Sequence, residues 1–559
     1  MALVLAGDLD IDQVMPRIEA EFGGWKPGPD PAPTQYEVAP FAADQRLRAR
    51  ATPVRVGAIA YRTVPESHPD YAALLLARRL LTNEQRSGFI DRLSDEGKLL
   101  YAMYVPAELV DTNLDVVAYL PRLISQTFRG AERLVSEQFR RVRAGEFDDR
   151  SFLALKQGLL AAETARWEDN RERALAMAHA FVARGGWDGQ LRYFQRLRAV
   201  TRDDVQRVAG EYFGERRLIL RSRAGYPKKT RLHKPSYPAV TPSGGHSQYF
   251  AEQRARPRPP PRVDFVEPDA AVQTLQLREG VTLRANPNPF NDLYHLELRF
   301  GVGSEQLREL DLLAQYLARI GSQRFPGEQL RRRLFELSTT LTVTAELDRF
   351  VVRLQGPQQH MEAALDLLAD LMSAPQQERR PLRQIRRETW AFRRYERKNP
   401  PSVGMALRDH VLYGDKSPYH QKYGPRGARH TGSGRLLAAW DEVQRYSVEV
   451  GYVGREPAKA VAGAIDRRLR FAAAPKPAVP HVVYPRHTPA QTTIYFVPRR
   501  DAVQTQLWFA VEGESVPEDQ RAAADAFGEY FGGSMAGLVF QEVREFRALA
   551  YAASARFVR

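Results

Sequence analysis

Two kinds of hydrophobic spacing divide the chain into regions that mix strands with helices. Apolar residues alternate with polar ones through 54–60 and again through 296–302, which predicts a strand in each place. Helical spacing follows, over 71–81 and 151–164 after the first strand and over 307–320 after the second. Such mixtures of antiparallel strands and helices are typical of α+β domains.

Further elements continue both regions. A short apolar run at 218–220 predicts a strand that closes the first region. The second region continues with predicted strands at 341–347 and 350–354 and an amphipathic helix at 361–372. A last region, after residue 488, has strand-like runs and a helical pattern.

The first residues of the chain recur in its second half. Apolar residues 2–6, a turn at Gly7 and a helical pattern over 12–22 predict a strand-to-helix unit. The same unit recurs at 448–469, where Gly454 takes the place of Gly7. A repeat this long indicates duplicated multi-domain halves, because solenoid repeats have periods of only about 20–50 residues.

Composition narrows the possible classes of protein. A length of 559 residues predicts roughly three or four domains, and the 43% hydrophobic content is ample for several cores. The absence of cysteine excludes disulfides and thiolate metal sites, and it fits the cytoplasm and the periplasm equally well. The chain contains no run of about 18 apolar residues, so it predicts no transmembrane helix. The first residues do not have the pattern of a signal peptide.

The net charge of +15 has three explanations. A basic face for nucleic acid is one. However, arginine is spread along the whole chain and no basic motif is interleaved with aromatic residues, so an arginine-rich coding bias explains the charge better. A preference for acidic substrates stays open.

Residues 226–267 are rich in Pro, Arg, Lys and Gly. The run Arg256–Arg262 is the most proline-rich part, and it predicts an extended linker between two halves. A proline-motif ligand is the alternative.

The segment from Arg544 to Tyr551 is the most distinctive in the chain. It follows a helical pattern over 521–531 and a glycine break at Gly532 and Gly533. In order and spacing it resembles the substrate-clamping segment of the pitrilysin/insulinase family of zinc metallopeptidases. That family has a clamshell of tandem homologous α+β domains, each an antiparallel sheet with packed helices.

The resemblance covers essentially the whole chain and implies five parts. They are a C-terminal remnant of a first, zinc-bearing domain at 1–30, a second pitrilysin-like domain of the inactive type at 45–225, the linker at 226–267, a third domain with a decayed zinc motif at 268–475, and a truncated fourth domain at 485–559.

The family's zinc motif, His-x-x-Glu-His on a helix, is missing from this chain. Aligned on the Gly303–Glu305 end of a strand, the motif positions fall on Leu312, Gln315 and Tyr316, and the distal ligand position falls on Glu388. Leucine and tyrosine are poor zinc ligands and glutamine cannot act as a base. We expect Glu388 to be a surface or salt-bridged glutamate. None of the eleven histidines lies at ligand spacing, so we expect no metal in this chain.

The resemblance assigns Arg544 and Tyr551 to substrate binding and oxyanion stabilisation. A guanidinium offers fixed donors to a carbonyl, and a phenol offers one more where negative charge develops. The family often has glycine before this tyrosine, whereas this chain has Ala550. The alternative is an ordinary surface arginine and a half-buried strand tyrosine.

The resemblance therefore implies the non-zinc-bearing part of a metalloendopeptidase, which shapes a peptide-binding chamber. Zinc and the general base would come from the absent first domain, so the chain alone would be inactive. The expected partners are peptide substrates and a pitrilysin-like partner subunit or a second copy, with no nucleic acid and no membrane span. The alternatives are a non-catalytic scaffold or partner subunit, and a basic nucleic-acid-binding protein. Bacterial relatives favour the periplasm.

Overall fold

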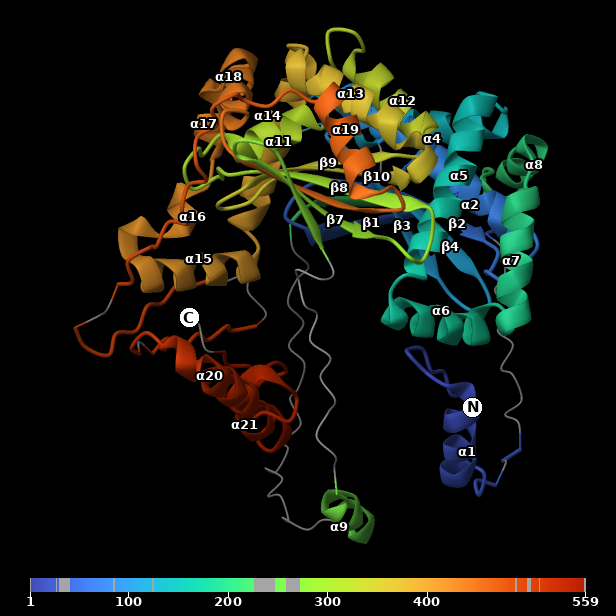
Figure 1. The fold of residues 1–559 in the computed structure, drawn as a ribbon. Helices are drawn as coiled ribbons and strands as arrows, with labels where there is room; N and C mark the ends of the chain where they lie inside the picture. The colour runs from blue at the N-terminus through green and yellow to red at the C-terminus, as the bar shows by residue number, and fades with distance from the viewer. Residues whose placement is uncertain are drawn as a thin grey trace. The chain divides into compact units, whose positions relative to one another are not determined.

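The computed structural model describes residues 2–26, 28–29, 41–83, 86–122, 125–225, 247–257, 272–487, 490–499, 504–511 and 513–556. The chain divides into two compact units (Figure 1). The larger comprises Met1–Pro227, Glu267–Arg486 and Tyr495–Asp501, and the smaller comprises Lys228–Val266, His487–Ile494 and Ala502–Arg559. None of the described helices is both long and apolar enough to cross a membrane.

The larger unit contains two sheets. The first has five strands in the order β1-β5-β2-β4-β3. Their bounds are β1 Gln45–Thr52, β2 Val56–Thr63, β3 Tyr101–Glu108, β4 Asn113–Leu120 and β5 Leu218–Ala224. The helices of this region are α2 Tyr71–Leu81, α3 Phe89–Asp95, α4 Phe128–Arg143, α5 Asp149–Arg166, α6 Asn170–Ala183, α7 Trp187–Ala199 and α8 Arg202–Tyr212. We call residues 45–224 the first sheet domain.

The second sheet has six strands in the order β6-β7-β11-β8-β10-β9. Their bounds are β6 Gln273–Arg278, β7 Val281–Pro287, β8 Leu293–Phe300, β9 Thr340–Ala345, β10 Phe350–Pro357 and β11 Val448–Gly454. The helices are α11 Leu310–Leu317, α12 Gly327–Glu336, α13 Met361–Ser373, α14 Arg379–Glu396, α15 Pro400–Tyr413, α16 Pro418–Gln421, α17 Pro425–His430, α18 Ser433–Val443 and α19 Ala458–Arg468, with single turns η1 Gln358–His360 and η2 Gly414–Lys416. We call residues 273–468 the second sheet domain.

The two sheet domains share one topology. With β6 set aside, the strands β7-β11-β8-β10-β9 take the places of β1-β5-β2-β4-β3. In both sheets the last strand of the region pairs in parallel with the first and antiparallel with the second. In both, two helices follow the second strand and a longer run of helices follows the fourth. The predicted fold class, tandem α+β domains of antiparallel sheet with packed helices, is confirmed.

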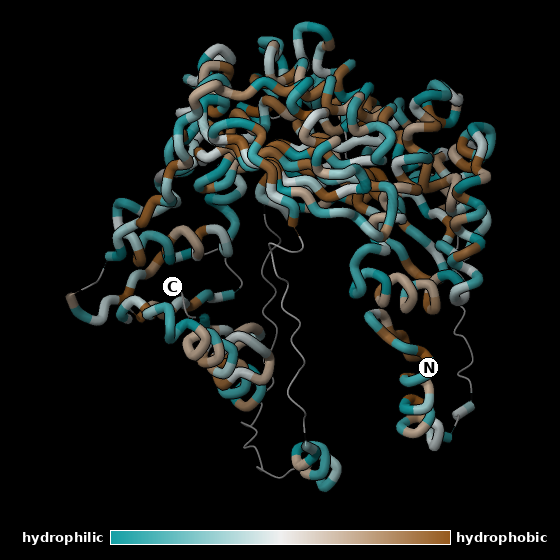
Figure 2. Tube along the Cα trace, viewed as in Figure 1, coloured by the Kyte–Doolittle hydropathy of each residue, from teal (hydrophilic) through white to brown (hydrophobic). Residues whose placement is uncertain are grey.

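Each sheet buries one apolar face under its helices, as the sequence pattern predicted. In β8 the alternation places Leu296, Leu298 and Phe300 in the core at 0–1% exposure. Trp440 of α18 packs on Phe300 with the ring centroids 5.6 Å apart. Figure 2 shows the apolar positions concentrated along the strands and on the helix sides that face them.

The N-terminal strand-to-helix prediction is half right. The helix forms as α1 (Ile11–Phe22), capped by Asp10, and none of its residues is buried. Residues 2–6 form no strand. A strand needs a neighbour to pair with its backbone groups, and no described strand pairs with this segment.

Corrections of the same kind apply to the smaller unit. The strand-like run 506–511 belongs to no sheet, and Phe509 is 90% exposed. Residues 552–556 also form no strand. The predicted helix over 521–531 is split into α20 (Arg521–Gly528) and a π-helical turn. The remaining elements are η3 Glu518–Gln520, the π-helical turns η4 Glu529–Gly533 and η5 Gln541–Glu545, and α21 Leu538–Phe540.

The predicted linker lies mostly outside the described residues. Its described part, 247–257, is not extended, because Gln248–Ala255 forms the helix α9. The Ser247 side chain caps this helix by accepting a hydrogen bond from the Phe250 backbone N–H.

Candidate functional site

Arg544 and Tyr551 lie together in the smaller unit. The Arg544 guanidinium carbon is 5.1 Å from the centroid of the Tyr551 ring and 4.7 Å from that of Phe540. The chain turns back between them, since the Ala548 N–H donates to the Arg544 carbonyl and Ala548 has a φ of 47°. Tyr551 is 84% exposed and lies in no strand, so it is not the half-buried tyrosine of the alternative, which leaves an ordinary surface pair open.

The glycine break before this segment has a steric cause. Gly532 is buried, and its carbonyl accepts a hydrogen bond from the Ala555 N–H. A Cβ at position 532 would lie 2.3 Å from the Ala555 nitrogen, so only glycine fits there. The close approach holds the end of the segment against the π-helical turn, with the guanidinium and the phenol as neighbouring donors.

The decayed motif lies on α11, and its side chains are occupied by packing. Leu312 and Tyr316 are buried at 2% and 0% exposure. The Tyr316 hydroxyl accepts from the Glu378 backbone N–H and lies 2.9 Å from the Glu378 carbonyl, to which it donates. Gln315 faces outward and donates to the Asp311 carbonyl. Leu312 and Tyr316 therefore pack α11 into the core, and Tyr316 joins it to the residue that precedes α14.

Glu388, at the distal ligand position, forms a salt bridge. Its carboxylate lies 2.7 Å from an Arg319 guanidinium nitrogen, and both side chains are largely buried. Gln384 also donates to it, at 3.2 Å. The salt-bridged glutamate that the sequence predicted is confirmed.

Zinc does not fit the four motif positions. Structural and catalytic zinc sites use thiolate, imidazole and carboxylate ligands, whereas these positions offer an alkyl group, an outward amide, a hydrogen-bonded phenol and a carboxylate paired with arginine. In the part of the chain that the structure describes, no three His, Asp or Glu side chains are grouped to hold a metal ion.

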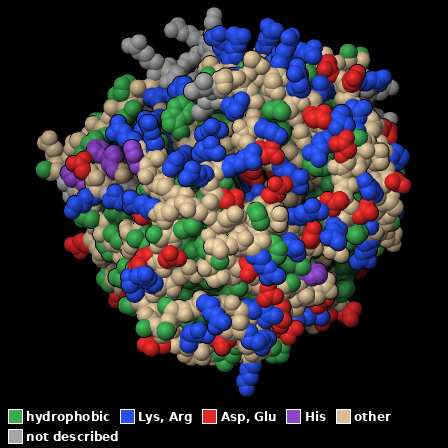
Figure 3. All heavy atoms as spheres, turned by 90° about the horizontal axis from the view of Figure 1, so that it is seen from above, with side chains coloured by type: hydrophobic (Ala, Val, Ile, Leu, Met, Phe, Trp, Pro, Cys, Tyr) green, Lys and Arg blue, Asp and Glu red, His purple; other side chains and the backbone are tan. Residues whose placement is uncertain are grey.

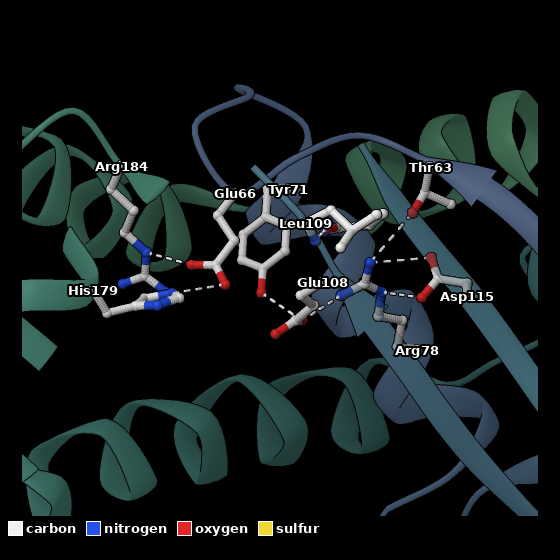
Figure 4. A network of polar contacts seen from close by, with 10 residues as sticks. Thr63, Glu66, Tyr71, Arg78, Glu108, Leu109, Asp115, His179 and Arg184 are labelled. Carbon is white, nitrogen blue, oxygen red and sulfur yellow. Dashed lines mark hydrogen bonds and ion pairs between the residues drawn. The ribbon is translucent and has the colours of Figure 1, made fainter. Parts of the chain in front are cut away.

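A buried ionic network in the first sheet domain was missed by the sequence reasoning (Figure 4). It centres on Arg78 of α2, the helix that takes the place of α11 in the shared topology. The Arg78 side chain is 2% exposed and lies 2.8 Å from Asp115 of β4 and 3.2 Å from Glu108 of β3. Tyr71 donates to the same Glu108 carboxylate at 3.0 Å. Burial raises the pKa of Asp115, and Arg78 opposes that shift.

A second group continues the network (Figure 4). Arg184 donates to the carboxylate of Glu66 at 2.7 Å, and His179 contacts the other oxygen at 3.0 Å. The Arg184 guanidinium stacks 4.0 Å above the Tyr193 ring, whose pKa is raised by burial. One sequence signal could have found the network: Arg78 interrupts the apolar stripe of the 71–81 helix.

A family model now identifies the relatives of this chain. Residues 1–159 and 448–559 match the model described as the peptidase M16 inactive domain. These two segments, just under half of the chain, are similar to the M16 peptidase family. This confirms the predicted resemblance to pitrilysin. Among curated proteins, none is significantly similar in sequence.

Solved structures of M16 proteins resemble the chain weakly. A mutant of the ferredoxin protease FusC, in complex with Arabidopsis ferredoxin, is 14% identical over 86% of this chain, with a TM-score of 0.39. The M16 inactive domain from Pseudomonas fluorescens is 20% identical over 51% of this chain and 71% of its own, also at 0.39. The periplasmic protease PqqL from Escherichia coli is 11% identical over 85% of this chain, at 0.34. The chain spans 57% of the FusC chain and 56% of the PqqL chain.

Proposed function

We propose that this chain is the non-zinc-bearing part of an M16 zinc metalloendopeptidase. One observation carries the proposal. The chain contains two domains of the same topology, and the helix that corresponds to the family's zinc-motif helix, α2 in one and α11 in the other, contains no histidine in either. The match to an inactive-domain model supports the same conclusion. Zinc and the general base would come from another M16 domain, either joined to this chain or on a separate subunit.

In this proposal the chain shapes a chamber for peptides. Arg544 and Tyr551 would bind the substrate backbone and stabilise the developing oxyanion, and their closeness supports a joint role. A pitrilysin-like partner or a second copy of the chain would complete the assembly. The family resemblance favours the periplasm, which cell fractionation tests.

Co-purification from the native host tests the proposal. The tagged chain is isolated under mild conditions, and its companions are identified by mass spectrometry, together with any extension of the chain itself. We expect a polypeptide or extension that carries His-x-x-Glu-His and binds zinc. Only copies of the chain, with no such sequence, would instead indicate a non-catalytic scaffold.

A further inference from the structure

A basic pocket lies between the two sheet domains of the larger unit. It has a volume of about 570 Å³. One wall comes from the turn between β1 and β2, and the other from α14 and α17. Five arginines line it: Arg55, Arg386, Arg387, Arg394 and Arg429. Among the described residues, no acidic one belongs to the lining.

These five arginines differ from others around them. In the part of the chain that the structure describes, none of the five forms an ion pair with a carboxylate, whereas Arg393 on the same helix pairs with Glu396 at 2.5 Å. Lysine and arginine side chains are spread widely over the face drawn in Figure 3. Five guanidinium groups around one hollow repel each other unless an anion enters it. The pocket is therefore positively charged, which favours the binding of a negatively charged ligand.

Part of the arginine array is held in place. Arg386 donates to the carbonyls of Ala428 and Thr431 at 2.9 and 2.6 Å, and Arg55 donates to the Gln126 carbonyl at 2.8 Å. These bonds fix the side chains without neutralising them. A guanidinium fixed in this way loses little entropy when it binds a carboxylate.

The pocket also has an apolar side. Trp390 is 42% exposed, and the Arg394 guanidinium lies 5.4 Å from its ring centroid. Proline, valine and alanine side chains complete the lining. A ligand that fits both parts carries anionic groups next to an apolar or aromatic group.

We propose that this pocket binds a short acidic peptide segment, in which aspartate or glutamate carboxylates flank an apolar side chain. The carboxylates would pair with the arginines, and the apolar side chain would pack on Trp390. Single-stranded nucleic acid fits less well, because it needs a basic track with several stacked aromatics, and this pocket is short and offers one. The proposal uses no residue of the Arg544–Tyr551 segment and does not rest on the proposed peptidase function.

Fluorescence anisotropy with the full 559-residue chain tests the proposal. The probe is a fluorescein-labelled peptide, Glu-Asp-Phe-Glu-Asp, compared with Gln-Asn-Phe-Gln-Asn. We expect the acidic probe to bind more tightly, and we expect the double variant R387E/R394E to weaken binding by about tenfold or more. The variant W390A should weaken it as well, and thermal melting should show that both variants fold.

The control is R383E, which reverses one arginine charge on α14 outside the pocket lining and is compared with the single variants R387E and R394E as well as with the double variant. It should bind the acidic peptide nearly as well as the unmodified chain. Equal loss in R383E and R387E/R394E would overturn the proposal in favour of bulk charge. Tighter binding of labelled oligothymidine, dependent on the same arginines, would overturn it in favour of nucleic acid. Equal binding of the two peptides would overturn it outright.

Discussion

The guanidinium of Arg544 lies over the ring of Tyr551, with 5.1 Å between its central carbon and the ring centroid. The tyrosine is mostly exposed, whereas the arginine also contacts the Phe540 ring and lies 3.5 Å from the Glu545 carboxylate. The pair therefore presents one fixed donor and one accessible donor on the same surface of the smaller unit. In the proposed function, these two donors would bind a peptide carbonyl together.

The first prediction concerns this pair. In the complete peptidase, Tyr551→Phe and Arg544→Lys should each lower kcat/KM by about 10- to 100-fold, because each removes a donor to developing charge. Steady-state hydrolysis of a quenched fluorogenic peptide measures this. Tyr530→Phe, at another exposed tyrosine of the same unit, is the matched control and should change little. Unchanged kinetics in all three variants would refute the clamp.

The second prediction concerns the distal ligand position. Glu388→Gln should destabilise the larger unit by about 1–3 kcal/mol, because it leaves the largely buried Arg319 without its carboxylate. The midpoint of urea unfolding measures the loss. Zinc content, measured by mass spectrometry of the purified protein, should not change. A loss of bound zinc in this variant would show that Glu388 is a ligand.

The third prediction concerns the buried network. Arg78→Met leaves Asp115 buried without its partner, so the free energy of unfolding should fall by about 3–5 kcal/mol. Adding Asp115→Asn to this variant removes the uncompensated charge and should recover part of the loss. Urea unfolding of the four proteins in this cycle gives the coupling energy. If the two losses simply add, the pair is not coupled.

The fourth prediction concerns pH. Burial raises the pKa of Asp91 to about 7, although its carboxylate accepts hydrogen bonds from the backbone of Asn83 and Gly88. A raised folded-state pKa adds stability that is complete below the ordinary aspartate value and is lost as pH rises through about 7.

Asp91→Asn removes this titration. Relative to the unmodified chain, the variant should therefore gain stability progressively as pH rises from about 4 to about 7, by up to about 4 kcal/mol in total. Melting temperatures of both proteins across that range test the prediction. A constant difference between them would show that Asp91 is ionised throughout.

Local patterns predicted the parts of the fold that depend on local sequence. The apolar spacing places α2 at 71–81 and β11 at 448–454, where the structure has them. The strands expected at 2–6 and 506–511 are wrong, because apolar alternation shows that a strand can form and says nothing about whether a neighbour will pair with it.

The candidate functional residues also fall into two groups, those that local sequence reveals and those that only the fold brings together. The Arg544–Tyr551 segment is short and could be recognised from its spacing. For the network around Arg78 and Glu66 the sequence shows only that Arg78 interrupts an apolar stripe. Its partners cannot be read from the sequence, because the contacts join positions far apart, such as Glu66 and Arg184. The basic pocket also combines residues from both sheet domains, so only the folded chain shows it.

Peptide hydrolysis by separated and combined parts tests the central claim most directly. A quenched fluorogenic peptide is incubated with the purified chain and zinc, with an M16 domain that carries His-x-x-Glu-His, and with both together. We predict no hydrolysis and no stoichiometric zinc for the chain alone, and the highest activity for the mixture, which Tyr551→Phe should reduce. Zinc-dependent hydrolysis by the chain alone, or full activity of the zinc-bearing domain without it, would contradict the account.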